Sequence, residues 1–124
     1  MTNILLVTAE AKSQWSRSSK QTLAPLGEME ITSGDLAMAK AALSSLYDVV
    51  IIDDMPSTVE LVSAFHHRQP DIPIIVVNSD LSWQRAREAW RAGATDVVPK
   101  ALGNVELSSS IQRLLVDPGT AQEG

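Results

Sequence analysis

Cysteine is absent from the 124-residue sequence, which excludes a disulfide framework, a thiolate nucleophile and zinc sites of the usual spacing. No apolar run approaches the roughly 20 residues that a transmembrane helix needs, and no secretory signal pattern opens the chain. Positive charge is also scarce, since 10 Lys and Arg oppose 15 Asp and Glu and leave a net charge of −5. We therefore expect a cytoplasmic protein that binds neither nucleic acid nor a membrane.

Short apolar runs alternate with amphipathic segments five times along the chain. The apolar runs predict strands at residues 4–7, 29–32, 49–52, 72–77 and 96–98. The remaining segments predict helices at residues 13–26, 33–46, 57–68, 82–92 and 104–115, with Gly93 ending the fourth. This alternation predicts an α/β fold with a doubly wound, five-stranded parallel sheet. One domain would span residues 1–117, and residues 118–124 would form a frayed tail, compatible with a native end or a cloning junction.

The run of four β-branched residues at 49–52 predicts a central strand that is buried on both faces and ends in Asp53 and Asp54. Because the carboxyl ends of parallel strands converge, residues 8–10, 53–55, 78–80 and 100 are expected to line one crevice. A carboxylate after a strand often serves in a turn, but Lys100 at a neighbouring strand end favours a functional site at Asp53. For Glu10 and Asp54 we expect solvated carboxylates.

Residues 47–56, 73–77 and 93–100, taken together, resemble the receiver domain of bacterial two-component response regulators. The resemblance implies a flavodoxin-like, receiver-like sheet of strand order 2-1-3-4-5. It also implies a non-enzymatic signalling role, in which Asp53 accepts a phosphoryl group from a histidine kinase or phosphotransfer protein. Lys100 and Asn78 would contact that group. An enzyme acting on a small substrate is not expected, because no Gly-rich phosphate loop follows the first strand.

The same resemblance implies a Mg²⁺ site, whose ligands in the family include an acidic pair after the first strand. Thr8 and Ala9 stand in those two places here. The remaining candidate ligands are Asp53, the Met55 carbonyl and Glu10 in the adjoining place. Because Mg²⁺ demands a near-ideal octahedron and dehydrates reluctantly, we expect it to bind weakly or not at all.

Two further residues differ from the family pattern at places that read out phosphorylation. Asn78 stands where the family has Thr or Ser, and Val97 stands where it has an aromatic residue. Trp83 and Trp90 share one face of the predicted fourth helix, either packed in the core or forming an output face with Val97. That face would bind an output domain or a second copy of the chain. Two functions stay open: a phosphorylatable receiver, or a phosphorylation-independent atypical receiver that acts as a protein–protein interaction module.

Overall fold

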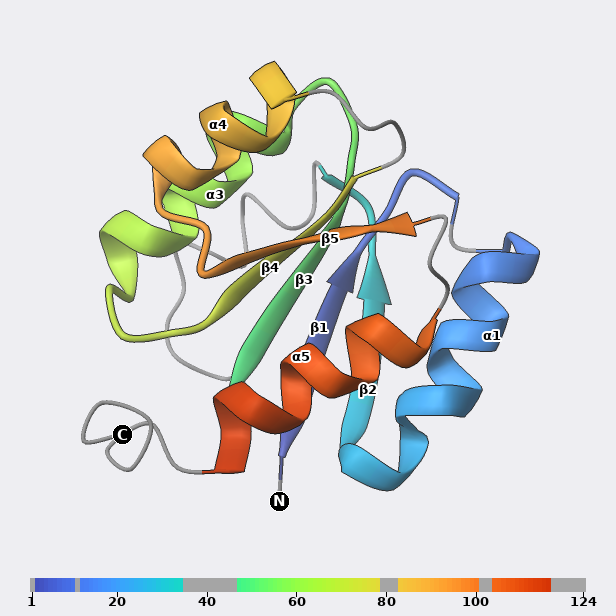
Figure 1. The fold of residues 1–124 in the computed structure, drawn as a ribbon. Coiled ribbons are helices and arrows are strands. Elements are labelled where there is room, and N and C mark those ends of the chain that lie inside the picture. Colours follow the sequence, from blue (N-terminus) through green and yellow to red (C-terminus); the bar gives the residue numbers. More distant parts are fainter. Residues whose placement is uncertain (1, 11, 35–46, 79–82, 101–103, 117–124) are drawn as a thin grey trace.

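The computed structural model describes residues 2–10, 12–34, 47–78, 83–100 and 104–116. Its centre is a five-stranded parallel sheet of order β2-β1-β3-β4-β5, which confirms the predicted topology (Figure 1). The strands are β1 (Asn3–Val7), β2 (Glu28–Thr32), β3 (Val49–Asp53), β4 (Ile74–Asn78) and β5 (Asp96–Pro99). The fourth strand begins two residues later than predicted, because Ile72 lies in the turn that leads into it.

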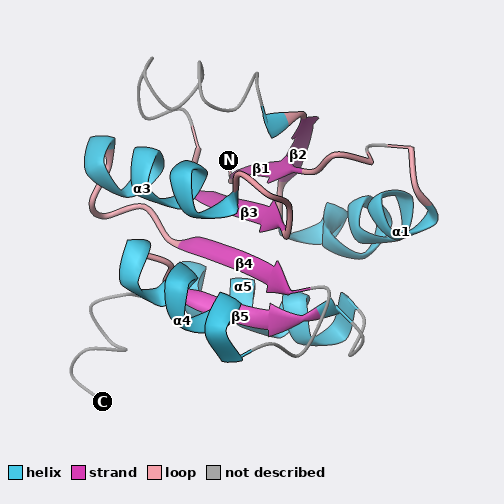
Figure 2. Cartoon of the chain, turned by 90° about the horizontal axis from the view of Figure 1, so that it is seen from above, coloured by secondary structure: helices cyan, strands magenta, loops and turns pink. Residues whose placement is uncertain are grey.

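Helices cover both faces of this sheet (Figure 2). They are α1 (Gln14–Leu23), which continues into the short 3₁₀ helix η1 (Ala24–Leu26), α3 (Thr58–Arg68), α4 (Trp83–Ala92) and α5 (Asn104–Val116). The α3 and α4 helices pack beside each other over one face, and α1 and α5 over the other. Most of the predicted helix at 33–46 and the predicted tail at 118–124 lie outside the described residues.

The core has two halves because successive strand side chains point to opposite faces of the sheet. On the α3 and α4 side, strand residues such as Leu5, Val50 and Ile74 pack around Phe65, the single phenylalanine of the chain. On the α1 and α5 side, Ile4, Ile51 and Ile75 are among the strand residues that pack against the helices. All five residues of β3 are buried, so the predicted central strand is confirmed.

The α1 helix packs against the rest of the domain through small polar residues as well as Leu23. Ser13 caps its first turn by accepting the Ser16 N–H at 3.1 Å, and Ser16 and Ser19 are both buried. Ser19 Oγ donates to Asn104 Oδ1 of α5 at 2.9 Å, which satisfies a hydroxyl that would be costly to bury alone. No helix within the described part of the chain is long and apolar enough to cross a membrane.

Gly93 ends α4 with φ at 122°, a region that side chains rarely adopt, and a Cβ at this position would meet the His66 ring of α3. We expect Gly93→Ala to lower the free energy of unfolding by roughly 1–3 kcal/mol, measured by urea denaturation. The double variant Gly93→Ala with His66→Ala should recover the part due to the His66 ring, and it should keep the parts due to the backbone and to the His66 Cβ, which alanine retains. Unchanged stability in Gly93→Ala would contradict both causes.

Candidate functional site

The parallel sheet brings the ends of four strands to one edge of the domain. Thr8 follows β1, Asp53 and Asn78 end β3 and β4, and Lys100 follows β5. Asn78 lies opposite Pro99 in the β4–β5 register, and it is buried like Asp53. The predicted convergence of these strand ends is therefore confirmed, although residues 79 and 80 fall outside the described part of the chain.

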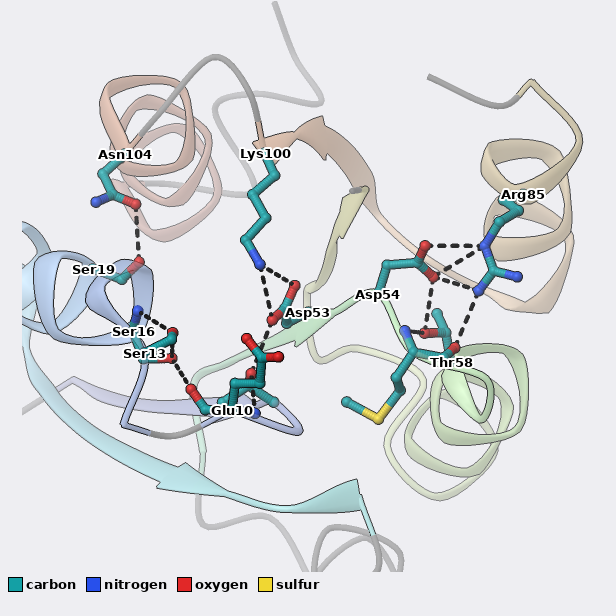
Figure 3. A network of polar contacts seen from close by, with 12 residues as sticks. Glu10, Ser13, Ser16, Ser19, Asp53, Asp54, Thr58, Arg85, Lys100 and Asn104 are labelled. Carbon is teal, nitrogen blue, oxygen red and sulfur yellow. Dashed lines mark hydrogen bonds and ion pairs between the residues drawn. The ribbon is translucent and has the colours of Figure 1, made fainter. Parts of the chain in front are cut away.

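Asp53 forms an ion pair with Lys100 at this edge (Figure 3). The Lys100 Nζ lies 3.2 Å from Asp53 Oδ1 and 3.3 Å from Oδ2, so one ammonium bridges both carboxylate oxygens. Thr8 Oγ1 donates a hydrogen bond of 2.9 Å to Asp53 Oδ2, and Thr8 Oγ1 accepts the Glu10 N–H at 3.1 Å. A carboxylate that is 7 % exposed thus has a charged and a neutral donor, which offset its loss of hydration.

Counting acceptor positions shows what Asp53 can still bind. Each carboxylate oxygen offers about two lone-pair positions, in keeping with the four acceptor sites of an ionised carboxylate. Oδ2 accepts from both Thr8 and Lys100, whereas the described residues supply Oδ1 with the Lys100 ammonium. Within the described part of the chain, one acceptor position on Oδ1 is therefore left for a further donor or for bond formation.

Lys100 is held from a second side by an aromatic ring. Its Nζ lies 4.6 Å from the centroid of the Trp15 ring, within the range of a cation–π contact. Trp15 belongs to the first turn of α1 and is half-buried. The ammonium therefore lies where both a carboxylate and an indole ring attract it. Trp15 carries no signal in the sequence that would place it in the site, because a helical pattern does not show that this ring reaches the end of β5.

Asp54 has a cation of its own, Arg85 of α4, and the expectation that Asp54 is a solvated carboxylate is wrong. Arg85 Nε lies 3.0 Å from Asp54 Oδ2 and 3.2 Å from Oδ1, and Arg85 Nη2 also donates to Oδ1. Thr58 Oγ1 adds a hydrogen bond of 3.3 Å to Oδ1. The Asp54 side chain is 11 % exposed in this ion pair. Arg85 also carries no signal in the sequence that would place it in the site, because an arginine on a polar helix is usually solvated.

The Met55 carbonyl, the backbone ligand expected for Mg²⁺, has two donors. The Thr58 N–H and Arg85 Nη2 each donate to it at 3.1 Å, which fills both of its lone pairs. Glu10 is exposed, and none of the ion pairs between described residues involves it. No cluster of three metal-ligating side chains occurs among the described residues. With two cations at this edge, this donor set does not fit an octahedral Mg²⁺ ion.

The two tryptophans of α4 are exposed, so neither of them packs in the core. Trp83 is 79 % exposed and Trp90 is 46 % exposed, whereas Ala89 of the same helix is buried against α3 and the sheet. Val97 is half-buried and packs on the α3 and α4 side of the core. Large apolar side chains at adjacent exposed positions often mark an interaction site, so an output face that includes them stays a prediction.

No protein-family model and no curated protein matches the sequence, but solved structures do. A response regulator receiver domain protein (CheY-like) from Methanospirillum hungatei JF-1 is 25% identical, with a TM-score of 0.80 over 100% of this chain and 99% of that one. A two-component response regulator from Clostridium difficile is 16% identical, with a TM-score of 0.81 over 96% of this chain and 99% of that one. A CheY-like protein (tadZ) from Pseudomonas aeruginosa PAO1 is 22% identical, with a TM-score of 0.73 over 92% of this chain and 99% of that one.

These similarities define the class of fold to which the domain belongs. The chain has the response regulator receiver fold, the CheY-like arrangement of five parallel strands in the order 2-1-3-4-5. The resemblance drawn from residues 47–56, 73–77 and 93–100 is therefore confirmed at the level of the fold.

The Asp53–Lys100 pair can be tested by neutralising its members one at a time. Lys100→Met removes the ammonium and leaves Asp53 with the Thr8 hydroxyl as its remaining described donor. We expect the free energy of unfolding to fall by roughly 1–2 kcal/mol, because a nearly buried carboxylate loses its charged partner. Adding Asp53→Asn should recover most of that loss. Urea denaturation measures both effects, with Lys20→Met, an exposed lysine of α1, as the control. Equal losses in the two lysine variants would contradict the pair.

Proposed function

We propose that this domain is an atypical receiver that works without phosphorylation, as a non-enzymatic protein–protein interaction module in signal transduction. The observation that carries the proposal is the Met55 carbonyl, both of whose lone pairs are bound by the Thr58 N–H and Arg85. A receiver that used Mg²⁺ would need this oxygen free. Because donors of the chain itself already bind this oxygen, we infer that the site does not need a metal ion.

The charge balance of the crevice supports the same conclusion. Transfer of a phosphoryl group to a carboxylate brings several negative oxygens together, and it is fast only where cations neutralise them. Arg85 is engaged by the neighbouring Asp54 carboxylate, so Lys100 is the described cation that remains in contact with Asp53. Thr8 offers a hydroxyl where a carboxylate would hold a metal ion. Phosphorylation of Asp53 would thus add more negative charge than Lys100 can neutralise.

The readout residues favour an interaction that does not depend on Asp53. A ligand shifts a conformational equilibrium only through differential contacts with its two states. Asn78 and Val97 supply neither the hydroxyl nor the aromatic ring that would provide such contacts in the family. Trp83 and Trp90 are exposed. We therefore assign the face of α4, β5 and α5 to an output domain or to self-association.

A second candidate, a phosphorylatable receiver, is favoured by one specific observation. The Asp53–Lys100 pair leaves an acceptor position on Asp53 Oδ1 at which a bond to phosphorus could form. In that reaction Oδ1 would attack the phosphoryl group of a phosphohistidine, the P–N bond would break, and the imidazole would leave. Lys100 would then pair with the acyl phosphate. The similar structures include response regulators as well as the CheY-like tadZ protein, so they agree with either candidate.

Intact mass separates the two candidates directly. After incubation of the protein with acetyl phosphate and Mg²⁺, we expect no mass increase of one phosphoryl group, because the charge of the acyl phosphate is not compensated. The control is Asp53→Asn, which lacks the nucleophile but keeps the shape of the side chain. An adduct that forms on the wild type and not on Asp53→Asn would establish the phosphorylatable receiver instead.

Partner binding tests the independence from Asp53. We expect the affinity of an isolated partner, or the dimerisation constant in sedimentation experiments, to change by less than about tenfold, or about 1.4 kcal/mol, between the wild type, Asp53→Ala and protein treated with a phosphoryl mimic. Trp90→Ala should weaken the same interaction, since it removes an exposed ring of the proposed face. A larger change with Asp53→Ala but none with Trp90→Ala would locate the interaction at the crevice instead.

A further inference from the structure

We infer that Arg85 is the resident cation of this crevice. In this role its guanidinium holds the Met55 carbonyl oxygen, one of the ligands expected for a metal ion, together with the Asp54 carboxylate. It thereby fixes the first turn of α4 on the loop between β3 and α3. Arg85 is the third residue of α4, far from both strand-end residues in the sequence. The inference deepens the proposed function, because a crevice with a built-in cation has no need of Mg²⁺.

The Arg85 guanidinium donates hydrogen bonds to two different groups, the Asp54 carboxylate and the Met55 carbonyl. Nε lies 3.0 Å from Asp54 Oδ2, Nη2 donates to Asp54 Oδ1, and the same Nη2 lies 3.1 Å from the Met55 carbonyl oxygen. A planar guanidinium presents its donors in a fixed geometry, which suits a carboxylate approached by two N–H groups. The side chains are 38 % exposed for Arg85 and 11 % for Asp54, so water screens the pair less than it would screen two fully exposed groups.

The receptor for Arg85 is held in place independently of Arg85. The Asp54 N–H donates to the Val77 carbonyl of β4 at 2.9 Å, which extends the sheet by one residue. The Met55 N–H donates to Thr58 Oγ1 at 2.8 Å, and that hydroxyl donates to Asp54 Oδ1. Thr58 is buried at the start of α3. The oxygens that Arg85 binds are therefore preorganised by the sheet and by α3. Because they do not have to be ordered when Arg85 binds, the contact contributes to positioning α4.

The position of Arg85 on its helix explains how this contact presents the tryptophans. At about 100° per residue, Arg85 lies roughly 200° around the helix from Trp83. Trp83 and Trp90 are seven residues apart and share the opposite, exposed face. Arg85 and Ala89 thus hold the inner side of α4, through an ion pair and an apolar contact respectively. Loss of the ion pair would leave the first turn of α4 with fewer constraints, while the end near Ala89 stays packed.

The test compares Arg85→Ala with Arg87→Ala, which removes an exposed arginine from the same helix. Hydrogen exchange of the α4 amides is measured in the full chain, without metal, with millimolar Mg²⁺ and with millimolar guanidinium ion. We expect exchange in the first turns of α4 to accelerate by about tenfold or more in Arg85→Ala, and to be slowed again by at least one of the two cations. Wild type and Arg87→Ala should respond to neither. Arg85→Lys should exchange at an intermediate rate, because an ammonium keeps the charge but not the fork.

Three outcomes would overturn the inference: equal exchange in Arg85→Ala and Arg87→Ala, faster exchange that neither cation slows, or saturable Mg²⁺ binding by the wild type in calorimetry. If Arg85→Ala does not fold, Asp54→Asn removes the anion and keeps its shape, and it should accelerate α4 exchange in the same way. Phosphorylation of wild-type Asp53 in the mass experiment would overturn the proposed function. It would leave the role of Arg85 standing as long as the wild type still binds no Mg²⁺ and the exchange results hold.

Discussion

Two consecutive carboxylates at the end of a buried central strand are the constraint on which this crevice depends. Because successive side chains of a strand point to opposite faces, Asp53 and Asp54 cannot share one counter-ion. Asp53 meets Lys100 on the side of α1, and Asp54 meets Arg85 on the side of α4. A nearly buried carboxylate that loses such a partner lowers the free energy of unfolding by roughly 1–2 kcal/mol. The end of β3 therefore fixes where β5 must deliver its lysine and where α4 must begin.

Local patterns in the sequence predict the fold, and they also predict the Asp53 and Lys100 part of the site. Apolar runs such as residues 49–52 and 74–77, alternating with amphipathic segments, predict strands of a buried parallel sheet. The topology of that sheet then brings Asp53 and Lys100 together. Arg85 could not be found in this way, because it lies on a helix whose polar residues are expected to be solvated. Trp15 could not be found either, because a helical pattern does not show that its ring reaches the end of β5. Which helical residue reaches a strand end depends on how each helix packs across the sheet, and a periodic pattern carries no such information.

The two sides of the β3 end are not equivalent. On the α4 side the Asp54 carboxylate and the Met55 carbonyl are engaged by Arg85 and Thr58, with both lone pairs of the carbonyl used. On the α1 side Asp53 keeps an acceptor position on Oδ1, and its ammonium partner is shared with an aromatic ring. A new donor or reactive group can therefore approach Asp53 without displacing any bond on the α4 side. The Asp54 side of the strand end is thus closed by Arg85, whereas the Asp53 side, which pairs with Lys100, can still accept a further donor.

This division bears on whether the fold can act as a switch. A switch needs two arrangements that differ by only a few kcal/mol, so that a modest ligand energy can exchange them. Hydrogen bonds to charged groups contribute about 1.5–3 kcal/mol each where they are shielded from water, and less where they are partly exposed, as at Arg85. Arg85 makes several such bonds to a receptor held by β4 and α3. None of these bonds is made to Asp53, which agrees with the proposal that α4 keeps its place when Asp53 is modified.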